Sequence, residues 1–203
     1  MKVVIVGATG LIGKAVATLL RDKGHEIVPV SRHSQPGMDI NDPTSIGACY
    51  AAIGEFDAVI SASAGAESSG TLSELTDEGI DRDIRSKLLG QVNLVRQGLS
   101  KVWPGGVFIL TGGLLAYAPR PKTSVLAMVN AGLDGFVRSA ALDVQGTHRI
   151  VIVHPPTVRE WAIRRGIDGS PLPSAETIAA AYLMALESKI TGQPVFVEGY
   201  HPS

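Results

Sequence analysis

The first fourteen residues constrain the fold more than any other part of the chain. They read Met1-Lys-Val-Val-Ile-Val-Gly-Ala-Thr-Gly-Leu-Ile-Gly-Lys14, a β-branched run followed by three glycines. The run Val3–Val6 is continuously apolar, as expected of a strand buried on both faces of a parallel sheet. Gly7 permits a tight turn, Gly10 lets backbone approach a phosphate, and Gly13 lets the next helix pack closely on the strand.

The residues after the glycines predict a helix whose N-terminus lies at this turn. Lys14–Arg21 carries apolar residues at helical spacing, and Gly24 ends the pattern. Free N–H groups and the positive end of the helix dipole would then point at the turn, where an anion binds well. A second strand, Glu26–Val30, follows at the spacing of a βαβ unit. This context favours dinucleotide binding over a merely structural glycine turn.

Composition excludes several classes of function. The 203 residues are 45% hydrophobic and contain no linker-like stretch, so we expect one domain over residues 1–203. The net charge is −1 and the charges are interspersed, so we expect no basic patch for binding nucleic acid and no basic surface for binding a membrane. We see neither a signal-peptide pattern nor an apolar run of bilayer-spanning length, and expect a cytoplasmic protein. The single cysteine, Cys49, fits a buried helix residue, and no metal site is expected.

Strands and helices alternate along the rest of the chain. A further strand is predicted to begin at Phe56 and to end in the small residues Ala62–Gly65. Three more are predicted at Val107–Thr111, Arg149–His154 and Pro194–Glu198. Helices are predicted at Thr44–Ile53 after an Asp42 N-cap, Ile84–Leu99, Ser124–Leu142, and Thr177–Leu186 after a Ser174 cap. This alternation predicts a three-layer α/β fold with a doubly wound, Rossmann-type parallel sheet. The ligand should lie at the carboxyl ends of the strands, near Gly7, Arg32, Ala64 and Thr111.

The residues after the second strand bear on which dinucleotide binds. An acidic side chain there accepts a hydrogen bond from the 2′-OH of the adenosine ribose, whereas an arginine pairs with a 2′-phosphate. Ser31 and Arg32 stand where the acid would be. The sequence therefore favours NADP(H) over NAD(H), unless Arg32 is an ordinary solvated loop residue.

Two later segments concern partners and substrate. Ser124–Leu142 is apolar nearly all round, and packing against a second subunit would explain this, so we expect a homodimer or homotetramer.

Thr157–Pro173 is punctuated by glycine and proline and suits a mobile loop over a substrate pocket. Its candidates for lining the pocket are apolar (Trp161 and Ile163) or cationic (Arg159, Arg164 and Arg165), although Trp161 could equally anchor the loop to the core.

These segments together make the chain similar to the short-chain dehydrogenases/reductases over nearly its whole length. Gly7–Gly13 resembles the family's glycine motif, and Ser31-Arg32 resembles its NADP-selecting pair. Asp39-Ile40 resembles the site of the acidic residue that meets the adenine ring. Ala62–Gly65 stands for the family's Asn-Asn-Ala-Gly with both asparagines gone, and Thr191–Gly199 resembles its last strand.

The turn, the end of the second strand and this resemblance together assign the cofactor residues. Pro155 keeps the first place of the family's Pro-Gly after the strand Arg149–His154, although the glycine is replaced by Pro156. Asn130 could position cofactor or substrate, or could satisfy backbone within its helix. The predicted cofactor-binding residues are Gly7, Thr9, Gly10, Leu11, Ile12, Gly13, Ser31, Arg32, Asp39, Ile40, Ala62, Ser63, Ala64, Asn130 and Pro155.

The resemblance also implies a catalytic set from which this chain departs. Family members use a Tyr-x-x-x-Lys pair, in which tyrosine donates the proton and lysine lowers its pKa. Aligning the family's Lys-Ala-Ala-Leu with Asn130–Leu133 puts Asn130 at the lysine and Leu126 at the tyrosine. The family's serine then falls on Gly113 and its helix asparagine on Lys87. Leucine cannot transfer a proton, so a non-standard site is expected.

Three residues are candidates for catalytic help. Lys87 could stabilise a developing oxyanion or donate a proton if burial lowers its pKa; alternatively, it is a solvated lysine on a polar helix face. Tyr117 could act as an acid or pack on the surface. A transplanted family pair of Tyr117 with Lys122 is disfavoured, because their spacing is five rather than four and Pro119 and Pro121 forbid the helical turn that would bring them together. Thr111 could position substrate or satisfy backbone.

The sequence leaves three functions open. The first is NADP(H)-dependent hydride transfer to or from a small carbonyl or alcohol substrate at the non-standard site. The second is a non-catalytic NADP(H)-binding sensor or regulatory protein, which the loss of the catalytic set would favour. The third is a non-redox isomerase or dehydratase on the same fold, because the fold alone does not fix the reaction.

Overall fold

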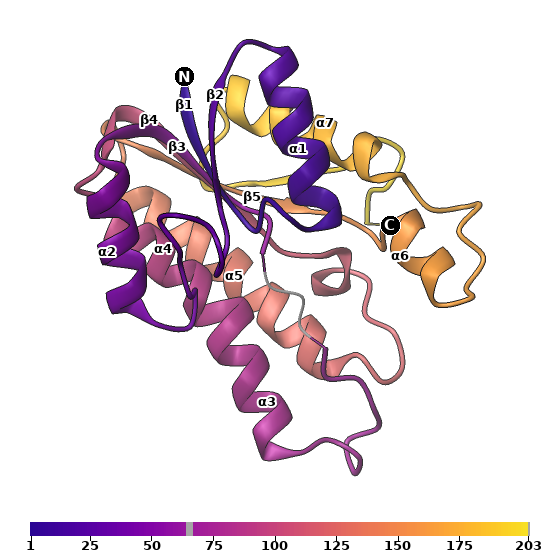
Figure 1. Ribbon diagram of the computed structural model, residues 1–203. Helices are drawn as coiled ribbons and strands as arrows, with labels where there is room; N and C mark the ends of the chain where they lie inside the picture. Colours follow the sequence, from indigo (N-terminus) through magenta and orange to yellow (C-terminus); the bar gives the residue numbers. More distant parts are fainter. Residues whose placement is uncertain (64–66, 203) are drawn as a thin grey trace.

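The computed structural model describes residues 1–63 and 67–202, which are built on a six-stranded sheet with parallel pairing throughout. Its strands are β1 (Lys2–Val6), β2 (Glu26–Val30), β3 (Phe56–Ser61), β4 (Val102–Thr111), β5 (Arg149–His154) and β6 (Pro194–Phe196), in the spatial order β2-β1-β3-β4-β5-β6. β2 and β3 pair on opposite sides of β1, so the direction of winding reverses there. The predicted doubly wound α/β fold is confirmed (Figure 1).

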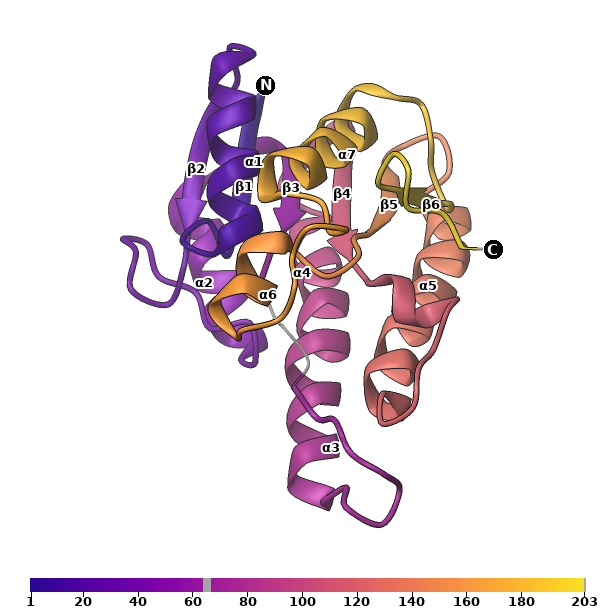
Figure 2. The same cartoon turned by 90° about the vertical axis from the view of Figure 1, so that its right-hand side faces the viewer.

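Helices cover both faces of this sheet (Figure 2). One face carries α1 (Leu11–Asp22) and α7 (Ala175–Glu187); the other carries α2 (Pro43–Ile53), α4 (Gly90–Gly98) and α5 (Ser124–Asp143). Val3 and Ile5 of β1 belong to the core on the α1 and α7 face, whereas Val4 and Val6 belong to the opposite core. All four side chains are nearly inaccessible to solvent. The continuously apolar run therefore serves two cores at once.

The helix before β4 begins earlier than the sequence predicts. Instead of Ile84–Leu99, the structure has α3 (Asp77–Asp83), a π-helical turn η1 (Ile84–Leu89) and α4 in succession. The Thr76 hydroxyl caps α3 by accepting a hydrogen bond from the Gly79 N–H at 3.1 Å. α3 extends away from the sheet and is mostly polar (Figure 1), so no apolar periodicity marks it in the sequence.

Other boundaries also differ from expectation. β4 starts at Val102 rather than Val107, and β6 stops at Phe196 rather than Glu198. The segment Thr157–Pro173, expected to be a loop, contains the short helix α6 (Arg159–Arg164). The side chains of Asp42 and Ser174 cap α2 and α7 as predicted.

The expectation that no apolar segment reaches membrane-spanning length needs correction. By length and composition α5 qualifies, with a mean hydropathy of 1.3, and it alone does so among the residues described. Most residues of α5 are small or apolar; Asn130, Asp134 and Arg138 are among the exceptions. One side of α5 packs on β5 as part of the core, as expected of an inner helix of this fold.

Candidate active site

The carboxyl ends of β1 and β3 meet at the reversal point of the sheet. Gly7 ends β1 with a φ of +86°, and a Cβ at this position would lie 2.7 Å from Cα of Ser63. A Cβ on Gly13 would come even closer to the turn, 2.1 Å from the Gly7 carbonyl oxygen. Backbone therefore packs on backbone from the turn to the first turn of α1, and larger residues do not fit. The N-cap residue of α1 is Gly10, which has no side chain to cap the helix.

A pocket of about 400 Å³ opens beside this turn. It brings together seven of the residues predicted to bind the cofactor: Gly7, Thr9, Ser31, Arg32, Asp39, Ile40 and Ser63. These residues come from the ends of three adjacent strands and from the loop after β2. An elongated ligand in this pocket would lie across the carboxyl ends of β2, β1 and β3.

The loop after β2 is held in place by Ser34. The Ser34 hydroxyl accepts a hydrogen bond from the Ser31 N–H at 2.9 Å and lies 2.7 Å from the Pro36 carbonyl oxygen. Arg32 is exposed beside this turn, and among the described residues no carboxylate lies within 4.0 Å of its guanidinium. Its charge is available to a ligand in the pocket.

The far wall of the pocket includes residues that the sequence did not single out: Val6, Met38, Asn41, Glu67, Arg82, Asp83 and Ser86. Asp83 is buried, and its carboxylate accepts hydrogen bonds from the N–H groups of Glu67 (3.1 Å) and Ser68 (2.7 Å). Burial would raise the pKa of Asp83, but these hydrogen bonds and the charge of Arg82 together lower it. Had the helix been predicted from Asp77 onwards, helical spacing would have grouped Asp83, Ser86 and Lys87 on one face.

The other predicted cofactor residues that the structure describes do not line this pocket. Gly10 and Ile12 belong to the start of α1, and the Ala62 N–H donates to the Val6 carbonyl oxygen at 2.8 Å. The Pro155 carbonyl oxygen accepts from the Leu114 N–H at 3.2 Å. Ala64 falls outside the described residues.

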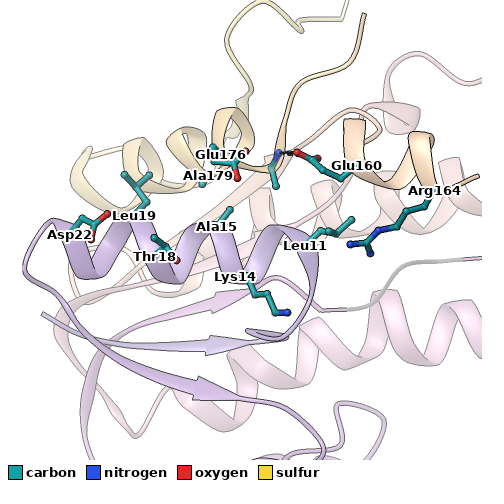
Figure 3. Close-up of a pocket in the computed structure, with 11 residues that line it drawn as sticks. Leu11, Lys14, Ala15, Thr18, Leu19, Asp22, Glu160, Arg164, Glu176 and Ala179 are labelled. Carbon is teal, nitrogen blue, oxygen red and sulfur yellow. Dashed lines mark hydrogen bonds between the residues drawn. The ribbon is translucent and has the colours of Figure 1, made fainter. Parts of the chain in front are cut away.

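Leu11 faces a second pocket of about 450 Å³ between α1, α6 and α7 (Figure 3). Lys14 and Arg164 line this pocket from α1 and α6, and the Glu160 carboxylate ties α6 to α7 by accepting from the Ala175 N–H. The loop expected to cover a substrate site thus lies against α1 and α7. Of its other candidates, Trp161 is 40% exposed, and the Arg165 guanidinium stacks 4.0 Å from its ring.

Lys87 is buried, not solvated. It lies in the π-helical turn η1, and its Nζ donates to the Gly112 carbonyl oxygen at 2.9 Å. Burial lowers the pKa of Lys87 from 10.5 to about 8. Among the described residues, no carboxylate lies within 4.0 Å of its ammonium group. Taking such a group out of water is costly, and strongly perturbed groups of this kind concentrate at functional sites.

The structure brings Lys87, Gly113 and Asn130 together at the end of β4. A Cβ on Gly113 would lie 2.9 Å from Nδ2 of Asn130, so the glycine makes room for this amide. Asn130 is buried, yet its Oδ1 has no hydrogen-bond partner among residues 1–63 and 67–202. A buried acceptor without a partner is expensive and points to a missing donor.

A buried polar network lies next to this group. His154, at the end of β5, is inaccessible to solvent; its Nε2 lies 3.3 Å from the Asp134 carboxylate and its Nδ1 lies 3.1 Å from the Gly113 nitrogen. Tyr117 donates its hydroxyl proton to Asp134 at 2.8 Å and packs edge-on against the His154 ring. Burial and the hydrogen bond to Asp134 raise the pKa of Tyr117. No pattern in the sequence connects His154 with Asp134, because they lie on different elements.

Thr111 is held by internal contacts. Its hydroxyl contacts the Ser61 carbonyl oxygen and lies 2.6 Å from the Tyr182 hydroxyl on α7. The Gln91 side chain brackets its backbone, with Oε1 accepting from the Thr111 N–H at 2.8 Å and Nε2 donating to the Thr111 carbonyl oxygen at 2.9 Å. These contacts fix the end of β4 against β3, α4 and α7.

Comparison with known proteins places this geometry in a family. The family described as Enoyl-(Acyl carrier protein) reductase matches residues 7–200. Versicolorin reductase 1 of Aspergillus parasiticus is 28% identical over 197 residues, which cover 85% of this chain and 75% of that protein. Carbonyl reductase family member 4 of Danio rerio is 26% identical over 227 aligned positions, covering 97% of this chain and 95% of the relative.

Solved structures agree with this placement. The protein lin1944 from Listeria innocua superposes with a TM-score of 0.89 at 33% identity, covering 97% of this chain and 99% of its own. A small-chain dehydrogenase in complex with NADPH superposes with a TM-score of 0.86 at 25% identity, covering 98% and 97%. This chain belongs to the short-chain dehydrogenase/reductase family, and its homologues are reductases and dehydrogenases.

The buried charge of Lys87 should cost stability at neutral pH. Because its pKa in the folded protein is about 8 against 10.5 in the unfolded chain, the unfolded state binds more protons between these values, and stability rises with pH across this window. We expect Lys87→Met to raise the free energy of unfolding at pH 7 by on the order of 3 kcal/mol. Urea unfolding at pH 7 and pH 10 should show this gain shrinking at the higher pH. A gain equal at both pH values would contradict the buried charge, and Lys189→Met at an exposed site is the matched control.

Proposed function

We propose that this chain is an NADP(H)-dependent oxidoreductase that transfers hydride to or from a small carbonyl or alcohol substrate. The observation that carries the proposal is the pocket at the carboxyl ends of β1, β2 and β3, in which Ser31 and Arg32 stand where a ribose-binding acid would otherwise lie. A free arginine at this point suits a 2′-phosphate, and NADPH is bound by a neighbour of similar structure.

Two features of this chain fit a bound dinucleotide. The N-terminus of α1, which has no side-chain cap, offers N–H groups to a diphosphate. The unpartnered Oδ1 of Asn130 would accept a hydrogen bond from a ribose hydroxyl or a substrate O–H. Gly7, Thr9, Asp39, Ile40 and Ser63 would form the cradle for the adenosine end.

When bound, the nicotinamide supplies the hydride, and the chain must stabilise the charge that develops on the acceptor oxygen. We assign this task to Lys87, whose ammonium group is buried, lacks an acidic partner in the described residues and has a pKa of about 8. A lysine with this pKa can donate a proton near neutral pH or stabilise an oxyanion as a fixed charge. Tyr117 is the second candidate acid, and Thr111 would act by holding the end of β4.

The preference for NADPH should depend on Arg32. We expect Arg32→Asp to weaken NADPH binding by about 10- to 100-fold, because it removes a charge-assisted contact and adds a repulsive carboxylate. Titration of the protein with NADPH and with NADH, followed by cofactor fluorescence, measures both affinities. Arg120→Asp, in an exposed loop outside the pocket, is the control. Failure of the unmodified protein to bind either cofactor would overturn the proposed function.

Turnover should depend on Lys87. We expect Lys87→Ala to lower kcat about 100-fold or more while NADPH binding is preserved, since the acid or fixed charge is lost but the cradle is not. The assay follows NADPH absorbance with a panel of small ketones and aldehydes, with Lys189→Ala as control. Unchanged turnover would remove Lys87 from the mechanism. Product formation without any change in absorbance would indicate the isomerase or dehydratase alternative instead.

We also propose that the protein is a homo-oligomer assembled through α5. Met128, Gly135 and Leu142 are spaced seven residues apart and therefore lie on one side of this helix. The side chains of Met128 and Leu142 are 47% and 72% exposed. A second copy of the chain would cover this stripe.

Light scattering of the purified protein tests this assembly. We expect a mass two or four times 21.2 kDa, and a shift to the monomer mass when Met128 and Leu142 are both replaced by Glu, because buried carboxylates would disfavour the interface. The double substitution Lys101→Glu and Lys189→Glu, away from this stripe, serves as the control for added negative charge. A monomer before substitution would refute the assembly.

A further inference from the structure

A single peptide group beside the site is held at both ends by ionisable side chains. The Gly112 carbonyl oxygen accepts from Nζ of Lys87 at 2.9 Å. The N–H of the same peptide group, which belongs to Gly113, donates to Nδ1 of His154 at 3.1 Å. Lys87 comes from η1 and His154 from β5, so this peptide group is the link between two distant parts of the chain.

Both residues of this peptide must be glycine for the contact to form. A Cβ on Gly112 would lie 2.5 Å from Cε1 of His154, and a Cβ on Gly113 would lie 2.9 Å from Nδ2 of Asn130. Side chains at these positions would push the imidazole or the amide away from the peptide. The pair Gly112-Gly113 therefore serves close approach of His154 and Asn130 rather than an unusual backbone conformation.

Asp134 determines which nitrogen of His154 carries the proton. With the proton on Nε2, the ring donates to the Asp134 carboxylate at 3.3 Å and keeps the Nδ1 lone pair for the Gly113 N–H. The other neutral tautomer would donate from Nδ1 to the Gly113 carbonyl oxygen at 3.0 Å but would turn the Nε2 lone pair toward the carboxylate. Two opposed lone pairs repel, so Asp134 favours the Nε2–H tautomer.

The ring of His154 is also fixed sterically. Tyr117 packs edge-on against it with ring centroids 5.2 Å apart, and Phe196 stacks on it at 5.8 Å. Tyr117 is in turn hydrogen-bonded to Asp134. The position of the imidazole ring, its rotation and its tautomer are therefore all fixed by contacts other than the one to Gly113.

We propose that Asp134 and His154 position Lys87 by fixing the Gly112–Gly113 peptide group, which makes His154 a positioning residue for this site. The proposal rests on the role assigned to Lys87 above. A peptide group polarised at its N–H by an acceptor is a better acceptor at its carbonyl oxygen, so His154 strengthens as well as orients the contact to the ammonium group. Because Lys87 has no acidic partner among the described residues, this carbonyl is what holds its charge in place.

The charged and titratable groups around His154 in the described residues come from several elements. They are Lys87 from η1, Asp134 and Arg138 from α5, Tyr117 after the 3-10 turn η2 (Leu114–Ala116), and His201, which packs on Phe196. Burial lowers the pKa of His154 and the charge of Lys87 acts in the same direction, whereas Gly113 and Asp134 oppose them. The net direction is downward, which keeps the ring neutral and its Nδ1 able to accept at neutral pH.

Two substitutions of His154 separate positioning from packing. His154→Phe keeps a ring of similar size but offers no acceptor to the Gly113 N–H. His154→Asn places an amide oxygen where Nδ1 stands but leaves a void. The pKa of Lys87 is measured in each protein by NMR titration after labelling with [ε-13C]lysine, with the Lys87 resonance assigned from Lys87→Met. We expect the Phe variant to lower this pKa by roughly one unit, since the buried ammonium loses its fixed acceptor, and the Asn variant to change it by less than about half of that.

A packing role predicts the opposite ranking, with the Phe variant close to the unmodified protein, and that result or an equal shift in both variants would overturn the proposal. The 15N chemical shifts of the His154 ring in the unmodified protein give a test that does not depend on either variant folding. The Nε2–H tautomer supports the proposal, and the Nδ1–H tautomer refutes it. Neither measurement needs turnover or cofactor, so failure here is distinct from failure of NADPH binding or of the Lys87→Ala assay.

Discussion

The rest of the structure depends on a contact of backbone with backbone at the start of the chain. Gly13 packs against the Gly7 carbonyl oxygen at a distance that excludes any Cβ, and Gly7 also lies too close to Ser63, after the end of β3, to carry a Cβ. These contacts fix the angle of α1 to the sheet and bring the ends of β1, β2 and β3 together. The pocket that contains Arg32 and Asp39 lies where it does because these three ends converge.

The parts of the fold that the sequence predicts are those with a local physical signal. Val3–Val6 and the glycines after it specify a buried strand, a turn and a helix within fourteen residues, and the side chains of Asp42 and Ser174 cap their helices as expected. α3 was not predicted because most of its residues are polar and carry no apolar period. α6 escaped because it is short and depends on a distant contact, Glu160 with the start of α7.

The candidate site divides in the same way. Seven predicted cofactor residues line one pocket because they follow the ends of β1, β2 and β3 or lie in the loop after β2, and the topology of the sheet brings these segments together. No comparable local pattern in the sequence identifies Asp83, Asp134 and His154 as residues of the site. Asp134 lies within an apolar helix and His154 ends an apolar strand, and only their meeting across α5 and β5 gives either a partner. Long-range pairs of this kind have no periodicity or spacing from which a single sequence could reveal them.

The burial of Lys87 costs folding free energy, as the catalytic role proposed for this residue would require. A methionine at this position would fill similar space without a desolvation cost, yet the chain holds an ammonium group there with one carbonyl oxygen as its acceptor. Nearby, Oδ1 of Asn130 has no hydrogen-bond partner among the described residues. Gly112 and Gly113, which have no side chains, let His154 and Asn130 approach closely. Each feature alone costs folding free energy, and their concentration at the end of β4 is what a site built to bind and polarise a ligand requires.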